Sequence, residues 1–464
     1  MNSDTNTPAA SAPALTAPRA AVLGLQHMFA MFGATVTVPL ITGLDIGTTL
    51  LMAGLGTLLF HLVTGGKVPA FLGSSFAFLG GYAAIAPRLA DGSANVELLP
   101  YACFGVACSG LVYLVLAGLI KAFGIKRVMR CFPPIVTGPI IIAIGLGLAP
   151  VAVGSCKANW TLALTALAVI GICNIWGRGM IKIVPILIGL AASYAVSCFM
   201  KAPVLDDAGA QVVKDGIAQF KPLIDFSAVK SAAWIGNPIH KAQTILGVDF
   251  KNGAQIWSAI IAIVPIALAT IMEHIGDISA ISSTVGKDFI KDPGLHRTLT
   301  GDGLATTFAS LFGGPANTTY GENTGVLALS RVFNPVVVRI AAVFAILLSF
   351  CPKFAAIIST IPGPIVGGIS FVLYGMISAV GIRNLVENKV DFSKSRNLII
   401  AAVILVTALG GVTLPISLGK FNATLTPLAL ASLAGIILNA IFPAGDYAAR
   451  AAEDEPPKGN TFEV

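Results

Sequence analysis

The sequence predicts an all-α polytopic membrane protein, with about 14 transmembrane segments arranged as two inverted repeats of seven. Three observations support this fold class. Of the 464 residues, 55% are hydrophobic and only 11% are charged, whereas an ordinary soluble domain has roughly 25% charged residues. Apolar runs of about 20 residues, the length that crosses a hydrocarbon core as helix, recur along most of the chain. One long hydrophilic insert divides these runs into two equal groups.

The apolar runs give the order of the expected crossings. They start near residues 20, 46, 69, 98, 131, 160 and 182, and then near 254, 298, 314, 335, 354, 396 and 424. We therefore expect a first repeat at 19–200, an extracytoplasmic loop at 201–252 and a second repeat at 253–445, between a disordered tail at 1–18 and a polar tail at 446–464. An odd number of spans in each half inverts the second half relative to the first.

The distribution of Lys and Arg predicts the orientation. With the N-terminus inside, the inner loops, tails and membrane ends hold 18 basic residues, against four in the short outer loops: Arg88, Lys157, Lys353 and Lys420. This bias follows the positive-inside rule and places both termini in the cytoplasm. The net charge of +7 is then loop charge, so we expect a lipid environment and no nucleic-acid partner.

The third crossing of each half is a poor helix. Residues 68–87, VPAFLGSSFAFLGGYAAIAP, have proline near each end and Gly-Ser-Ser in the middle, and residues 313–325, GGPANTTYGENTG, are polar and glycine-rich. Only 33 residues separate Arg297 from Arg331, whereas two crossings need about 40. Irregular backbone at membrane depth is tolerated only where protein or a water-filled cavity satisfies it. Paired breaks in inverted halves therefore indicate a substrate site.

Ionisable side chains within the spans supply the expected chemistry. A charge at the bilayer centre costs about 2.5–3.5 kcal/mol, so such residues are functional candidates. Glu273 and Asp277 are four residues apart and share one helix face. Together with Glu322 they could take up and release protons, and as carboxylates accept strong hydrogen bonds from N–H donors. This chemistry suits a neutral, planar, NH-rich solute carried with a proton, and not an anion.

Other candidates lie in or beside the two broken segments. Phe76 offers a flat face to a planar ring, unless it is an ordinary core aromatic. Ser75 and Tyr320 could form hydrogen bonds with a solute, and Gly321 would admit it close to the backbone. Asp302 either bridges the broken helices or joins a proton path, and both alternatives remain open at this point.

The histidines are expected to be structural. His27 lies within an apolar span as a hydrogen-bonding residue, and His274 points roughly 100° away from Glu273 and should be packed. The histidines lack metal-ligand spacing, and no HExxH, Walker or GxSxG motif is present. We therefore expect no metal, no cofactor and no enzymatic activity.

Several motifs resemble the nucleobase/ascorbate transporter family, and within it the bacterial uracil permeases. They are LQHMFAMFGATVTVP, KVPAFLGSSFAF, EHIGD, KDPGLHR and PANTTYGENTGVLALSR. The resemblance covers nearly the whole chain except the tails and the insert. It implies 14 spans as two inverted repeats, a core domain and a gate domain, and short antiparallel strands in spans three and ten. It also implies a homodimer in the bacterial inner membrane.

The resemblance further implies roles for individual residues. The positions that match uracil-contacting residues, or lie beside them, are Phe76, Glu273, Gly321, Glu322, Ser75 and Tyr320. Tyr374 matches a gate-domain residue near the pocket. The family motif appears as Glu322, Asn323, Gly325, Ser330 and Arg331, with Ser330 in place of the usual Thr. Asp277 stands where familiar uracil permeases have His, so the resemblance leaves open which group relays the proton.

The implied function is proton-coupled import of uracil by alternating access. The nearest alternative is a xanthine or uric acid symporter on the same scaffold, but purine-selective relatives usually have Gln at the position of Glu322. An anion transporter of the related sulfate-carrier fold is disfavoured because Glu273 and Glu322 would repel its substrate. A passive channel is disfavoured by the inverted halves, which are typical of alternating access.

Overall fold

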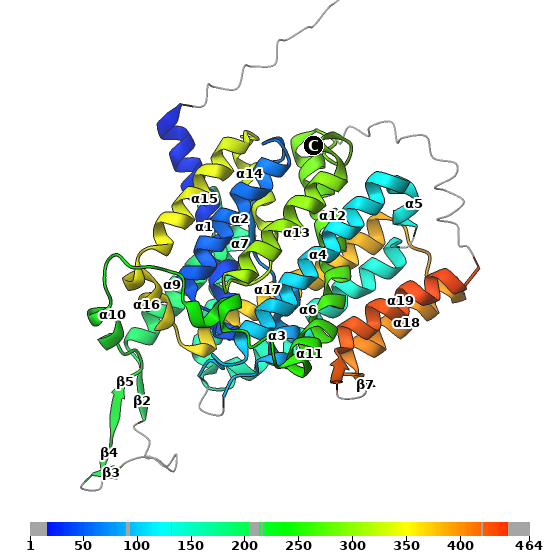
Figure 1. Ribbon diagram of the computed structural model, residues 1–464. Helices are drawn as coiled ribbons and strands as arrows, with labels where there is room; N and C mark the ends of the chain where they lie inside the picture. Colours follow the sequence, from blue (N-terminus) through cyan, green and yellow to red (C-terminus); the bar gives the residue numbers. More distant parts are fainter. Residues whose placement is uncertain are drawn as a thin grey trace, which may run out of the picture.

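The computed structural model describes residues 16–89, 93–130, 132–203, 213–214, 217–418 and 421–443. Apart from residues 16–18, the expected tails lie outside these ranges. Figure 1 shows a helical body with a thin β-stranded arm at the end opposite the start of α1 (Ala17–Thr42). The arm contains β2 (Lys201–Pro203) and β5 (Phe220–Pro222), which pair antiparallel. The paired strands of the hydrophilic insert and the start of α1 thus lie at opposite ends of the body.

The elements before the arm are mainly helices. In chain order they are α1, α2 (Ile46–Val63), β1 (Leu72–Ser74), the 3-10 helix η1 (Phe76–Phe78), α3 (Leu79–Ile85), α4 (Leu99–Phe123), α5 (Ile125–Met129), α6 (Pro134–Cys156), α7 (Trp160–Trp176), α8 (Met180–Ile183) and α9 (Pro185–Cys198). The insert adds β2, β3 (Val213–Lys214), β4 (Ile217–Ala218), β5, α10 (Ser227–Ser231) and the 3-10 helices η2 (Lys241–Gln243) and η3 (Ile245–Gly247).

The elements after the arm include a second break at a strand. They are α11 (Gly253–Ile263), η4 (Val264–Ile266), α12 (Ala267–Val285), the π-helical turn η5 (Ile290–Gly294), α13 (Leu295–Leu311), β6 (Asn317–Thr319), α14 (Glu322–Ser330), α15 (Pro335–Ser349), α16 (Pro352–Ser359), α17 (Gly363–Glu387), α18 (Ser395–Leu409), β7 (Leu414–Leu418), β8 (Phe421–Leu425) and α19 (Pro427–Ile441).

Six helical segments among the described residues are long and apolar enough to cross a membrane, or seven if the bent pair α15 and α16 is one span. Five shorter apolar helices have 10–17 residues: Phe76–Ile85, Trp160–Trp176, Pro185–Cys198, Ser395–Leu409 and Pro427–Ile441. The crossing expected from about residue 354 begins instead at Gly363, because α16 is a separate short helix that lies at 86° to α15. The structure is therefore a mostly helical membrane protein.

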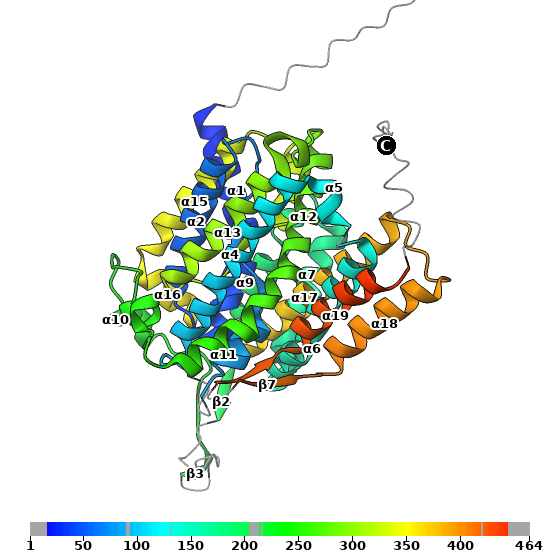
Figure 2. The same ribbon diagram turned by 45° about the vertical axis from the view of Figure 1, so that its right-hand side comes forward.

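Eleven of the helices form two packed groups, and each group draws on both halves of the chain. The first bundle comprises α1, α2, α4, α13 and α15, and the second bundle comprises α6, α7, α9, α17, α18 and α19. Figure 2 shows α18 and α19 side by side at one flank of the body. In the first bundle a Cβ on Gly110 of α4 would lie 2.6 Å from Gly303 O of α13, and a Cβ on Gly303 would lie 2.6 Å from Gly110 O. These glycines let the two backbones touch, as is typical of membrane helices.

The outer surface of the bundles is apolar, as a bilayer requires. On α4, Leu111, Val115 and Leu119 recur every fourth residue and are 49%, 63% and 41% exposed. Such a stripe would be unfavourable in water, and lipid chains solvate it at no cost. The opposite face of α4 is buried against α13 and α11. Both faces of α4 are thus apolar, because one face contacts lipid and the other packs against protein.

Candidate functional site

The two broken segments meet as a buried two-stranded sheet. Strands β1 and β6 pair antiparallel, with Leu72 opposite Thr319 and Ser74 opposite Asn317. The ladder continues beyond the strands, because Ser75 N donates to Ala316 O and Tyr320 N donates to Phe71 O, each at 2.9 Å. Backbone that has left the helix inside the body is therefore satisfied by the other broken segment, which is the condition for such backbone at membrane depth.

A short helix begins directly after each strand. Phe76 opens η1, which leads into α3, and Glu322 opens α14. The amide groups at a helix N-terminus carry a partial positive charge and favour acceptors. Two helices thus begin next to one small sheet, each directly after one of its strands.

Tyr320 joins three elements at the centre of this arrangement. Its Oη donates to Ser74 O at 2.9 Å and lies 3.3 Å from Thr35 Oγ1 of α1. A Cβ on Gly73 would lie 2.5 Å from the Tyr320 ring, so only glycine leaves room for the ring across β1. The hydroxyl that was expected to face a solute therefore also holds β1, β6 and α1 together.

The acidic face of α12 lies against the second broken segment. Glu273 and Asp277 are both partly exposed on this helix. A Cβ on Gly321 would lie 3.0 Å from Asp277 Oδ1, so this carboxylate packs directly over the backbone that precedes α14. The side chain of Glu322 lies outside the described part of the structure, whereas its backbone directly follows Gly321 at the start of α14. The acids of α12 and the glutamate position of the second segment thus occupy one region.

Phe76 and Ser75 line the other side of the region. The Phe76 ring packs edge-on against Tyr374 of α17, with 5.8 Å between ring centroids and 76° between the planes. Phe76 is 7% exposed and Tyr374 is 1% exposed. Ser75 Oγ is buried and has no hydrogen-bond partner among the residues that the structure describes. The first broken segment thus contacts the second bundle through an aromatic pair and leaves one hydroxyl unused by the described residues.

A buried polar cluster supports β6 from behind. Thr319 Oγ1 donates to Asp302 Oδ1 of α13 at 3.1 Å and lies 3.0 Å from His274 Nδ1 of α12. His274 Nδ1 is also 3.5 Å from Asp302 Oδ2, and both side chains are fully buried. Through these contacts Asp302 links α13 to β6 and to α12. His274 is packed, as expected, but as a hydrogen-bonding member of this cluster.

His27 and Asn323 fix the first turn of α14 to α1. Asn323 Nδ2 lies 3.1 Å from His27 Nδ1 and donates to His27 O at 3.1 Å. Both residues are buried. His27 thus forms a buried hydrogen-bonded contact between α1 and α14. Sequence reasoning overlooked Thr35 and Thr319, although hydroxyls adjacent to broken segments are the natural partners of freed backbone and side-chain groups.

Comparison with known proteins assigns the chain to a family. The sequence model of a family described as "Permease family" matches residues 18–417. The chain belongs to this family.

Relatives of this permease-family chain cover most of its length. It is 42% identical over 436 residues to the uracil permease of Bacillus caldolyticus, covering 92% of this chain and 93% of that protein. It is 38% identical to the putative pyrimidine permease RutG of Escherichia coli strain K12, covering 94% of this chain and 91% of the relative. These proteins are permeases, so the chain is a transporter rather than an enzyme.

Solved structures with little sequence identity share the fold. The transmembrane domain of the cyanobacterial bicarbonate transporter BicA aligns with a TM-score of 0.57 at 14% identity, covering 92% of this chain and 98% of that one. SLC26A9 aligns with a TM-score of 0.62 at 14% identity, covering 91% of this chain and 64% of that one. This similarity concerns the arrangement of helices and carries no information about the solute.

Proposed function

We propose that this chain imports uracil together with protons by alternating access. The observation that carries the proposal is the packing of Asp277 over Gly321, which brings the acidic face of α12 to the start of α14. Uracil is a neutral ring whose N–H groups are donors, and carboxylates are the acceptors that bind such donors most strongly. Relatives named uracil permeases at 42% and 39% identity support this choice of solute.

The residues of the site divide into three roles. Phe76 provides the apolar face against which the ring lies, beside Ser75 as a hydrogen-bonding group. Glu273 and Glu322 accept the ring N–H groups, and Gly321 admits the ring close to the backbone. Tyr374 of α17 closes the site from the second bundle as a gate residue, in contact with Phe76.

Proton coupling follows from the same carboxylates. Glu273, Asp277, Glu322 and Asp302 are the candidate proton carriers, because burial favours the neutral form of a carboxyl group and exposure to water favours the charged form. Among them Asp302 is bonded to Thr319 and faces His274, so its position suits a supporting group. Glu273 and Asp277 are partly exposed, which makes them the stronger candidates for taking up and releasing protons.

The proposed architecture is that of 14 spans in two inverted repeats, residues 19–200 and 253–445. The long and short apolar helices, with α13 and the segment from β6 through α14, supply 14 candidate crossings. On this reading β1 and β6 belong to spans three and ten, the first bundle belongs to a core domain and the second to a gate domain. The excess of basic residues in the inner loops supports cytoplasmic termini and a place in the bacterial inner membrane. We also propose that the protein forms a homodimer.

Ligand-dependent melting of the purified protein tests the solute. A ligand that binds only the folded state raises the melting temperature, so uracil should do so while xanthine, uric acid and sulfate should not. If only xanthine or uric acid raised the melting temperature, the solute would be a purine and not uracil. Stabilisation by sulfate alone would support an anion carrier.

Uptake into proteoliposomes tests the coupling. Labelled uracil should accumulate when the outside is made acidic, and collapse of the proton gradient should abolish accumulation while leaving exchange intact. Accumulation that is insensitive to the proton gradient would contradict symport with protons.

A further inference from the structure

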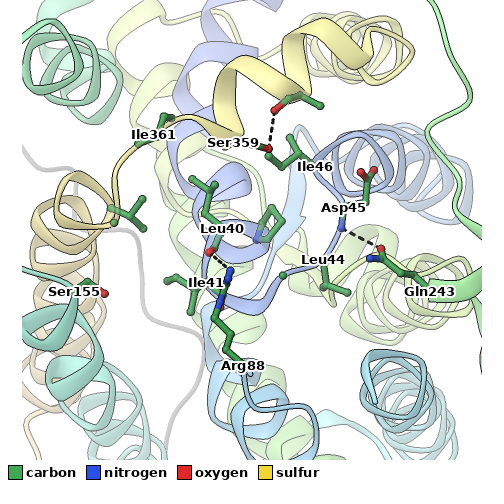
Figure 3. Close-up of a pocket in the computed structure, with 15 residues that line it drawn as sticks. Leu40, Ile41, Leu44, Asp45, Ile46, Arg88, Ser155, Gln243, Ser359 and Ile361 are labelled. Atoms are coloured by element: carbon green, nitrogen blue, oxygen red, sulfur yellow. Dashed lines mark hydrogen bonds between the residues drawn. The ribbon is translucent and has the colours of Figure 1, made fainter. Parts of the chain in front are cut away.

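A cavity of about 590 Å³ lies at the end of the body that carries the insert, apart from the site described above. Its wall combines the end of α1 and the start of α2 with Arg88, Ser155 of α6, the α16–α17 junction and Gln243 of the insert (Figure 3). None of the residues assigned to the central site lines it. The cavity lies where the first bundle meets the second, and its volume falls within the roughly 300–1,000 Å³ typical of small-molecule sites.

The polar groups of this cavity are held in fixed positions. Arg88 donates from Nε to Ile41 O at 2.8 Å and from Nη2 to Leu40 O at 2.5 Å, so its guanidinium serves the last carbonyls of α1. Asp45 caps α2 by accepting from Thr48 N at 2.6 Å, and its Oδ2 lies 3.4 Å from His240 Nε2. Both charged groups are therefore oriented before any solute arrives.

Gln243 contributes the donor that the fold does not use. Its Oε1 accepts from Asp45 N at 3.2 Å, which fixes the amide plane, and its Nε2 has no partner among the described residues (Figure 3). Ser155 Oγ and Ser359 Oγ each donate to a carbonyl of their own helix at 3.0 Å, so their oxygens remain acceptors. The cavity thus offers an oriented amide donor, hydroxyl acceptors and apolar walls.

This composition selects a class of solute. A phosphate or sulfate would meet Asp45, and its natural partner Arg88 is already bonded to carbonyls. A cation would meet Arg88. A small neutral ring that carries both N–H and C=O groups matches the donor, the acceptors and the apolar walls, which include Leu44 and Ile361.

We propose that this cavity is a second, outer binding site for the cyclic-amide solute, where it is received before it enters the central site. The inference rests on the proposed function for the identity of the solute and for the outward side of the cavity. Gln243 is its specificity residue: one amide group ties the insert to the start of α2 and presents a donor to the solute.

Thiol labelling with the central site disabled tests the second site. In a cysteine-free chain, Ser359→Cys places a reporter on the cavity wall, and a membrane-impermeant thiol reagent measures its access. Uracil should slow labelling of the reporter both with Glu322 intact and in the Glu322→Gln background, and the slowing should disappear when Gln243→Ala is added. Protection that vanishes with Glu322→Gln, or persists with Gln243→Ala, would overturn the proposal.

Uptake kinetics provide a readout that does not depend on the reporter. Gln243→Ala should raise the KM for uptake from outside roughly three- to tenfold, the effect of losing one hydrogen bond, at unchanged maximal rate. Gln255→Ala, on the first turn of α11 and outside the cavity, is the matched control and should change neither value. An unchanged KM in Gln243→Ala counts against the site. Failure of the wild-type chain to transport uracil would instead refute the proposed function itself.

Discussion

The two broken segments pair strand to strand and buried hydrogen bonds hold both strands, but the short helices that follow the strands are held in different ways. The first, β1 with η1, contains no ionisable side chain and contacts the second bundle through the Phe76 and Tyr374 rings. In the second, β6 with α14, Thr319 donates a hydrogen bond to Asp302 and contacts His274, and Asn323 donates one to His27 O from the first turn of α14. The comparison teaches that aromatic packing positions the short helix on the aromatic side of the proposed site and that buried polar contacts position the helix on its acidic side.

The largest loss of uracil affinity is expected from a substitution on the acidic side. Glu322→Gln replaces an acceptor-only carboxylate with an amide that is half donor. Loss of a hydrogen bond to a charged group costs about 1.5–3 kcal/mol, so affinity for uracil should fall roughly 10- to 100-fold in equilibrium binding to purified protein. Glu387→Gln, at the exposed end of α17, is the control for loss of a negative charge. Unchanged affinity in Glu322→Gln would remove this residue from the site.

Substitution of Phe76, on the aromatic side, should lower the affinity for uracil less than Glu322→Gln does. Phe76→Ala removes the face against which the ring is proposed to lie, together with the edge contact to Tyr374. Aromatic pairs contribute about 0.5–1.5 kcal/mol beyond buried area, so affinity should fall roughly three- to tenfold. Phe76→Tyr keeps the face and should bind uracil nearly as the wild type does. Equal losses in the two variants would show that the size of the side chain matters, and not the face.

A third substitution separates the support of β6 from the binding of solute. Thr319→Val removes the hydroxyl that contacts both Asp302 and His274 and leaves buried polar atoms unpaired. The free energy of unfolding should fall by about 1–3 kcal/mol, seen as a lower melting temperature, with only a small change in affinity at low temperature. Thr318→Val, on the same strand, is the control and should melt near the wild type. A large loss of affinity with normal melting would place Thr319 in the binding site instead.

The sequence predicted the positions of the breaks because proline, glycine and serine interrupt helix locally. The face shared by Glu273 and Asp277 was equally predictable, since it follows from helix spacing alone. The partners of Tyr320 and His274 were not predictable in this way. Tyr320 Oη bonds to Ser74 O across 246 positions, and His274 contacts Thr319 across 45, so both contacts depend on how the strands pair. Local patterns therefore located the two broken segments, and tertiary contacts decided which of their polar groups the fold itself uses.

The smallest effect should come from Ser75, and it completes the comparison. Its Oγ is buried and no described residue bonds to it, so Ser75→Ala should leave the melting temperature unchanged. If the hydroxyl bonds to the solute, affinity for uracil should fall roughly twofold to tenfold, as for one neutral hydrogen bond. A fall in melting temperature with unchanged affinity would instead make Ser75 a structural residue. Ser75 would then stabilise the first segment as Thr319 is expected to stabilise the second.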